Sequence, residues 1–313
     1  MNASFLLYAL LNTVLVVLLS PFYMGLIKIV KARAQGRRGP PLLQPYYNLS
    51  KLLKKERIYS KNTSAIMRAT PYINIAVMLV ASLCIPLALI PTPTDGIGNV
   101  ILFLYMLALA KFFMALSGLD AGSTFGGMGS SREMSISAII EPITIIAFAA
   151  LSFSLHTTDF HQMFLERAGA TAFLNPGLLL IAIPLFIVLI VETSRVPVDN
   201  PETHLELTMV HEAMVLEYSG RDLALMELSH AIKQTLYMAV LINILLPWGL
   251  TSELTVAGIL IAAAAFALKA GLLSFVTGLV ESSMAKMRFF NLPSLFMIAF
   301  FFSILTIWLE VFG

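Results

Sequence analysis

Eight long apolar runs constrain this chain more than any other feature of its sequence. Each covers about twenty residues or more, the length that a helix needs to cross the hydrocarbon core of a bilayer. The predicted spans are 4–27, 71–91, 99–118, 134–155, 176–194, 230–250, 254–280 and 292–312. Only 12% of the residues are charged, whereas a soluble protein has about 25%. We therefore predict an all-α polytopic membrane protein with eight transmembrane helices, organised as a single membrane domain over residues 1–313.

Lys and Arg are distributed very unevenly between the two sets of connections that alternate along the chain. One set carries sixteen of these residues, whereas the other set carries only Arg167. Cytoplasmic loops are enriched in Lys and Arg, so the basic set is predicted to be cytoplasmic. The predicted cytoplasmic segments are 28–70, 119–133, 195–229 and 281–291. Both termini are then expected to lie outside the cytoplasm.

The first cytoplasmic segment contains a stretch, 41–57, in which leucines alternate with lysines and an arginine. A helix that lies in the membrane interface has this pattern, so we expect an amphipathic interfacial helix here. Contact with lipid headgroups alone would also explain such a basic helix. Just before it, Arg37 and Arg38 precede Gly39 and Pro40, which fix a bend where two arginines leave the membrane surface.

A few ionisable residues interrupt the apolar runs. They are Lys111, Glu141, Glu192, Lys269 and Glu281. Each costs about 2.5 to 3.5 kcal/mol to place in a span, so such residues usually face a protein interior or water. The predicted orientation puts Glu141 and Glu192 in the cytoplasmic half of the membrane. A Glu near a helix end can also simply reach water, and for Glu192 both interpretations stay open.

The segment 195–229 is unusually acidic for a connection beside a membrane. Its acids are Asp199, Glu202, Glu206, Glu212, Glu217, Asp222 and Glu227. Asn200 and Pro201 form a helix-start signal and Gly220 a stop signal, which predicts a helix over 201–219. Glu202 and Glu206 are then neighbours one turn apart. If that helix is buried, one or both of them are expected to hold a proton near neutral pH, and if it is exposed, they form a solvated acidic face.

The sequence contains no self-sufficient catalytic centre. The single cysteine, Cys84, excludes an iron–sulfur cluster or a thiolate zinc site built by this chain alone. His211 and Glu212 begin the zinc-protease motif, but Val215 stands where its second histidine is required. The net charge of +2 gives no indication of nucleic-acid binding. We expect no catalytic and no metal-binding residues, and therefore no activity of the chain alone.

Several ordered motifs resemble a known family. Residues 192–202 (Glu-Thr-Ser-Arg-Val-Pro-Val-Asp-Asn-Pro-Glu) are similar to the signature loop of the membrane subunit that forms the quinone chamber of respiratory complex I. The motif 37–40, the nine-residue spacing from Arg132 to Glu141, and residues 217–220 (Glu-Tyr-Ser-Gly) also match that family. The resemblance covers nearly the whole chain and implies the same eight-span fold and orientation.

Two departures indicate a particular branch of the family. Complex I members usually carry three acids after the proline of the signature loop, whereas here Glu202 and Glu206 flank His204. Residues 281–288 (Glu-Ser-Ser-Met-Ala-Lys-Met-Arg) lack the arginine-rich motif of complex I. Both features are similar to the corresponding subunit of energy-converting, membrane-bound nickel–iron hydrogenases of the formate hydrogenlyase, Ech and Mbh types.

The resemblance implies a subunit that anchors and couples an oxidoreductase complex in the prokaryotic cell (inner) membrane. Expected partners are the hydrogenase large and small subunits, an iron–sulfur subunit and antiporter-like membrane subunits, with the nickel–iron centre and the iron–sulfur clusters in those partner subunits. The implied arm-docking residues are Arg37, Arg38, Gly39, Pro40, Arg132 and Arg195. The implied path for protons or sodium ions comprises Glu141, Glu192, Asp199, Glu202, Glu206 and Glu217.

Two other functions stay open at this point. A true complex I subunit would bind and reduce a quinone, and a stand-alone carrier would bind its coupling ion at buried acids. The sequence decides neither the translocated ion, proton or sodium, nor the electron donor, which is ferredoxin, formate or carbon monoxide derived.

Overall fold

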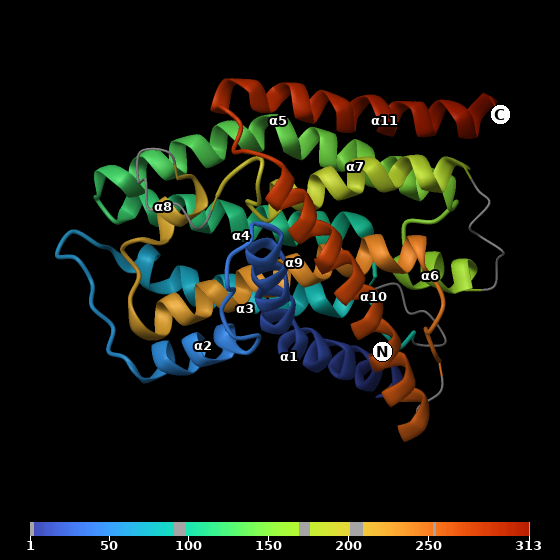
Figure 1. The fold of residues 1–313 in the computed structure, drawn as a ribbon, viewed down its shortest axis with the longest axis horizontal. Helices are drawn as coiled ribbons and strands as arrows, with labels where there is room; N and C mark the ends of the chain where they lie inside the picture. The colour runs from blue at the N-terminus through green and yellow to red at the C-terminus, as the bar shows by residue number, and fades with distance from the viewer. Residues whose placement is uncertain (1–2, 91–97, 169–175, 201–208, 253–254, 313) are drawn as a thin grey trace.

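The computed structural model describes residues 3–90, 98–168, 176–200, 209–252 and 255–312. All regular elements in these ranges are helices (Figure 1). They are α1 (Ala3–Ala34), α2 (Gln44–Lys54), α3 (Ala65–Cys84), α4 (Val100–Asp120), α5 (Thr124–Ser154), α6 (Phe160–Ala168), α7 (Pro176–Glu192), α8 (His211–Val215), α9 (Gly220–Leu245), α10 (Val256–Ser283), the 3-10 helix η3 (Phe289–Asn291) and α11 (Leu292–Phe312). The all-α prediction is confirmed for the described residues.

Six helices in the described ranges are long and apolar enough to cross a membrane, namely α1, α3, α4, α5, α10 and the η3–α11 unit. The two other predicted spans correspond to α7, an apolar helix of 17 residues, and to α9, whose first half carries charged residues. The chain is therefore a multi-pass membrane protein. The count of eight spans and the location of the termini remain predictions.

Helix α9 lies at the centre of the molecule (Figure 1). It contacts α1, α2, α3, α7 and α10, and its residues are buried almost without interruption from Ala231 to Ile244. Helices α4 and α5 pack against each other, and α11 lies along α5 and α7 at one edge (Figure 1). Most of this stretch is apolar, as expected of a helix that is buried on all sides.

The predicted amphipathic helix is present as α2. None of its residues is fully buried, and it lies against α1 and α9. Leu53 and Tyr47 remain exposed, as expected of a helix whose apolar side faces lipid. Pro45 stands in its first turn, where the missing N–H costs no helical hydrogen bond.

The start of the second predicted span differs from the sequence prediction. Helix α3 begins at Ala65, where the side chain of Ser64 caps it, so Pro71 lies inside the helix instead of opening the span. Proline has no N–H to donate to the carbonyl of Met67 one turn earlier. The hydroxyl of Tyr218 donates to that carbonyl instead, at 3.1 Å. A contact from a distant part of the chain thus compensates for the missing hydrogen bond.

The predicted helix over 201–219 is wrong in its described part. Residues 201–208 lie outside the described ranges, and the remainder forms only the five-residue helix α8, followed by a turn. The buried carboxylate of Asp199 accepts hydrogen bonds from the backbone N–H groups of Val210 and His211. This tertiary contact fixes the backbone just before α8, which local capping signals do not predict.

Candidate functional site

Glu192, the last residue of α7, is buried and held between two lysines. Lys111 of α4 lies 2.8 Å from its Oε1 atom, and Lys233 of α9 lies 2.7 Å from its Oε2 atom. Both ammonium groups compensate the carboxylate charge, which a buried acid requires because it has lost its water shell. Glu192 therefore joins α4, α7 and α9 through charge pairing in the protein interior.

Lys111 also connects Glu192 to Glu141. Its Nζ atom lies 3.4 Å from Oε1 of Glu141 on α5, so one ammonium group stands between two carboxylates. The side chain of Glu141 is 43% exposed, unlike that of Glu192. A cavity of about 360 Å³, otherwise mostly apolar, brings these three side chains and Tyr237 together. Lys111 thus links the buried Glu192 to Glu141, which lies on an outer face of the helix bundle.

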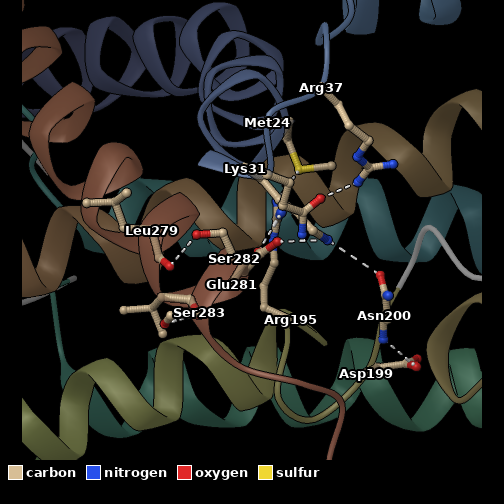
Figure 2. Close-up of polar contacts among 12 residues, drawn as sticks. Met24, Lys31, Arg37, Arg195, Asp199, Asn200, Leu279, Glu281, Ser282 and Ser283 are labelled. Carbon is tan, nitrogen blue, oxygen red and sulfur yellow. Dashed lines mark hydrogen bonds and ion pairs between the residues drawn. The ribbon is translucent and has the colours of Figure 1, made fainter. Parts of the chain in front are cut away.

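A second charge cluster centres on Glu281 of α10. Arg195 lies 3.0 Å from one carboxylate oxygen, and Lys31 of α1 lies 3.4 Å from the other (Figure 2). Arg195 also donates a hydrogen bond to Gln234 of α9. Gln234 directly follows Lys233, which holds Glu192, so the two clusters meet at adjacent residues of the central helix.

Asp199 anchors the signature loop from inside. It is buried, and its Oδ1 atom lies 2.7 Å from Nζ of Lys286 in the connection between α10 and η3. Its second oxygen accepts the two N–H groups that precede and begin α8. Asp199 therefore joins two segments that were predicted to be cytoplasmic. It contacts Lys286 in the segment 281–291 and the start of α8 in the acidic segment 195–229.

A separate cavity of about 370 Å³ lies between α1, α2, α8 and α9. Its polar lining includes Lys28, His211, Glu212, Glu227 and His230. The rings of His211 and His230 lie 4.4 Å apart between their centroids. Such a partly polar cavity, lined in part by the interfacial helix α2, is a typical ligand-binding shape.

Two groups of α8 in this cavity have shifted pKa values. Burial, with the nearby carboxylates of Glu227 and Asp199, raises the pKa of Glu212 to about 7. Burial and the nearby Lys233 lower the pKa of His211 to about 4. At neutral pH the imidazole is therefore uncharged, whereas the carboxyl can take up or release a proton.

The residues predicted to dock a partner arm occupy different environments. Arg37 and Arg38 are exposed between α1 and α2, and Arg37 donates a hydrogen bond to the side chain of Gln35. Gly39 lets the chain pass close to α1, since an added Cβ would lie 3.1 Å from the Cα atom of Ile29. Pro40 follows, exposed, and completes the bend before α2.

The other two arginines point inward. Arg132 of α5 is partly buried and donates to the backbone carbonyl of Met209 at 3.0 Å. Arg195 is only 3% exposed and is paired with Glu281. Within this chain both arginines hold the signature loop and the start of α8 in place, and Arg195 is buried whereas Arg132 stays partly exposed.

The motif 217–220 fixes the connection that leads into α3. The hydroxyl of Ser219 accepts a hydrogen bond from the backbone N–H of Ile58 at 2.8 Å and donates to its carbonyl at 3.1 Å. Gly220 has φ +54°, and a Cβ there would lie 2.3 Å from the carbonyl oxygen of Glu56. Only glycine fits this close approach. Glu217 lies partly exposed in the turn after α8.

Two acids of the predicted ion path, Glu202 and Glu206, lie outside the described residues. Among the described residues, no group of three or more His, Cys, Asp and Glu side chains is arranged to hold a metal ion.

Comparison with known proteins identifies the family. The family model described as NADH dehydrogenase matches residues 6–312. The chain belongs to the NADH dehydrogenase family, as a member of the complex I subunit 1 type. The resemblance inferred from the motifs is thereby confirmed.

Relatives within the NADH dehydrogenase family include subunits of two kinds of complex. Hydrogenase-4 component C of Escherichia coli (strain K12) is 31% identical, over 90% of this chain and 88% of that protein. Formate hydrogenlyase subunit 4 of the same strain is 29% identical, over 96% of both chains. The corresponding subunit of the NADH-quinone oxidoreductase of Anaplasma phagocytophilum (strain HZ) is 27% identical, over 69% of this chain and 68% of that protein.

A solved structure shares the fold. A chain of the membrane-bound sulfane sulfur reductase, an archaeal respiratory membrane complex, superposes with a TM-score of 0.79. The match covers 96% of this chain and 99% of the other, at 19% sequence identity. Similarity at this level shows a common fold and no more.

Four basic residues of the clusters were not predicted as site residues. They are Lys31, Lys111, Lys233 and Lys286, which pair with Glu281, Glu192 and Asp199. The sequence signals are the positions of Lys111 and Lys233 inside predicted spans, because a lysine there needs a buried partner. The identity of each partner depends on helix packing, which the sequence pattern does not reveal.

Proposed function

We propose that this chain is the membrane-anchoring and coupling subunit of a complex I-like energy-converting hydrogenase. The observation that carries the proposal is Glu192, buried between Lys111 and Lys233 and linked through Lys111 to the half-exposed Glu141. Such a chain of acids and bases between a loop and an outer face suits a coupling element. The kinship with hydrogenase-4 component C and formate hydrogenlyase subunit 4 supports the hydrogenase branch.

In this role the chain docks a cytoplasmic arm and contacts membrane partners. The arm consists of the hydrogenase large and small subunits and an iron–sulfur subunit, which hold the nickel–iron centre and the clusters. The exposed Arg37 and Arg38 beside the bend at Gly39 and Pro40 are the surface charges suited to this contact. Antiporter-like subunits complete the complex in the prokaryotic inner membrane, on the face where Glu141 is exposed.

Lys111 is the proposed switch between the two acids. Its ammonium group lies closer to Glu192 than to Glu141, and it stabilises whichever carboxylate it approaches. Movement of the signature loop, whose first residue is Glu192, would displace Lys111 toward or away from Glu141. Glu141 would then release or take up a proton, so a redox-driven change at the loop is converted into ion movement across the membrane.

The test is replacement of Glu141 by Gln in the assembled complex. Glutamine preserves the shape but cannot exchange a proton, so ion uptake into sealed vesicles should fall by about tenfold or more, the scale of a lost proton-transfer group. Hydrogen evolution is measured in the same vesicles. Normal uptake in the assembled E141Q complex would remove Glu141 from the path.

Glu310 provides a matched control. It is a partly buried carboxylate of α11 that accepts a hydrogen bond from Ser154 at the far end of α5. Thirteen residues of helix separate Ser154 from Glu141, which is about 20 Å. Glu310→Gln should therefore leave ion uptake unchanged.

The cavity between α1, α2, α8 and α9 favours one other function, that of a quinone-reducing complex I subunit. Purification in mild detergent distinguishes the candidates. A hydrogenase subunit should copurify with nickel–iron chains, a complex I subunit with flavin-containing chains, and a stand-alone carrier without either. Flavin chains in the purified complex would replace the first proposal with the second.

A further inference from the structure

A strongly basic pocket lies apart from both charge clusters. It has a volume of about 680 Å³ and is formed by the end of α2, the connection to α3, the first turns of α3 and the start of α9. Its cations are Lys54, Lys55, Arg57, Arg68 and Arg221. Of the lining residues, only Glu56 is acidic, so the pocket has an excess of positive charge and attracts an anion.

Three guanidinium groups of the pocket are held in place by neighbours. Arg57 donates to the hydroxyl of Tyr72 at 2.7 Å and lies 3.7 Å from the buried carboxylate of Asp222. Arg221 donates its Nε–H to the carbonyl of Leu53 at 3.2 Å. Because a guanidinium carries five N–H groups, these contacts leave further donors for a ligand. The donors are thus positioned before any ligand binds.

Arg68 is oriented by an aromatic ring. Its guanidinium carbon lies 5.2 Å from the centroid of Tyr59, and the hydroxyl of Tyr59 contacts Asp222. Arg57, Arg68 and Arg221 therefore come from three different elements and converge on one pocket. Convergent guanidinium groups are the arrangement that recognises phosphate oxygens.

The pocket lies at the level of the membrane surface. Helix α3 begins its apolar span at Ala65, so Arg68 stands in the first turn and Tyr72 in the second. Ile58 beside the pocket is 73% exposed, as is usual for an apolar side chain in contact with lipid. Arginine and tyrosine in this position match the headgroup region of a bilayer.

An exposed stripe on α3 continues from the pocket into the span. Tyr72, Ala76, Leu79 and Val80 are exposed on one helical face, below Arg68. Residues at these spacings share a face of an α-helix. A ligand with its phosphate in the pocket would therefore have an apolar surface for acyl chains directly beneath it.

We propose that this pocket binds the phosphate headgroup of an anionic glycerophospholipid whose acyl chains lie along the exposed face of α3. The bound lipid would connect α2, α3 and α9 by contacts to one headgroup. This site is independent of the proposed coupling function, since it contains none of the residues of the Glu192 and Glu281 clusters.

The experiment uses the complete purified complex after removal of lipid by detergent. Phosphatidylglycerol, phosphatidylcholine or inorganic phosphate is added, and thermal stability and retained lipid are measured, the latter by native mass spectrometry. Phosphatidylglycerol should raise the melting temperature and be retained, whereas phosphatidylcholine should do so much less. Equal effects of the two lipids would overturn the proposal, and an equal effect of inorganic phosphate would assign the pocket to a free anion instead.

Charge-removing variants locate the effect in the pocket. Lys55→Gln with Arg68→Gln should weaken phosphatidylglycerol binding by about tenfold or more. The matched control, Arg33→Gln with Arg288→Gln, removes two exposed cations outside the pocket and should bind as the parent does. If the first variant is unstable, Arg57→Lys keeps the charge but loses the paired donors, and it should still bind less lipid.

A protein partner in the pocket would give a different result. If the Lys55 and Arg68 variant retains phosphatidylglycerol but loses the soluble arm on purification, the pocket is a docking surface for protein and the lipid proposal is wrong. Parent-like lipid retention in all variants would overturn it as well. Loss of retention in the pocket variants alone, with the arm still attached, is the result expected.

Discussion

The ammonium group of Lys233 lies 2.7 Å from Oε2 of Glu192, while Lys111 holds the other oxygen of the same carboxylate at 2.8 Å. One acid therefore compensates two lysines on two different helices. Glu192 and Lys111 are buried and Lys233 is largely so, and loss of any one of these groups therefore changes the charge balance of the interior.

The first prediction concerns the order of stability among variants of this triad. Glu192→Gln removes the ion-pair partner of Lys233 and the nearer of the two carboxylates beside Lys111, and it should destabilise the chain by about 3 to 5 kcal/mol. Lys233→Met should cost less, because Lys111 still compensates Glu192. Thermal unfolding of the complex in detergent measures both, and a greater loss in the Lys233 variant would contradict the prediction.

The second prediction concerns docking by the first cytoplasmic bend. Reversal of Arg37 and Arg38 to Glu should detach the soluble arm while the chain remains in the membrane, because both side chains are exposed. Size-exclusion chromatography of the solubilised complex detects the loss. Reversal of Lys51 and Lys61, also exposed, is the charge-matched control and should leave the arm attached. An intact complex after reversal of both arginines would end the docking assignment.

The third prediction concerns the hydrogen bond from Tyr218 to the carbonyl of Met67. Tyr218→Phe leaves this buried carbonyl without a donor, because Pro71 has no N–H, and should destabilise the chain by roughly 1 to 3 kcal/mol. Pro71→Ala in the same background restores a helical donor and should recover part of the loss. No recovery would mean that the hydroxyl stabilises the chain in another way.

The fourth prediction concerns the pH dependence of Glu212. Its pKa, raised to about 7 by burial and by Glu227 and Asp199, lies above the unfolded value of 4.5. The folded chain then binds more protons than the unfolded chain between these values, so stability should fall as the pH rises from about 4.5 through about 7. Glu212→Gln should flatten this dependence. Infrared spectra should also show a carboxylic acid band that titrates near pH 7 and is absent from the variant.

The fifth prediction concerns orientation, which rests on the distribution of Lys and Arg. In a variant without Cys84, a cysteine in place of the exposed Lys51 should react with an impermeant thiol reagent only from the cytoplasmic side. A cysteine in place of Glu166 on α6 should react only from the opposite side. The reverse pattern would overturn the orientation.

Local patterns in the sequence were sufficient for some elements and misleading for others. Alternation of leucine and lysine correctly predicted α2, because an interfacial helix is specified by its own residues. The same kind of local reasoning predicted a helix over 201–219, whereas the chain forms a short α8 and a turn after it. There the local signals compete with Asp199, whose contacts to the backbone of α8 are tertiary.

In the candidate site, too, local sequence patterns indicated some residues, whereas others were revealed only by the tertiary structure. Glu141 and Glu192 stand out in the sequence because each is an ionisable residue in or at the end of an apolar run, whereas Asp199 was proposed from the family resemblance. Their basic partners were not assigned, since Lys111 is 81 residues from Glu192 and Lys286 is 87 residues from Asp199. Nothing in the spacing along the chain indicates those pairs.

The sequence by itself determined the membrane class, the apolar helices and the family, because hydropathy and motif order are properties of consecutive residues. The tertiary structure decided which charges meet, which arginines are exposed and where the basic pocket forms. Arg37 and Arg195 illustrate this, since both follow the end of a long helix, yet one is exposed and the other is buried against Glu281. Burial and charge pairing depend on which helices pack together, and only the folded chain specifies that packing.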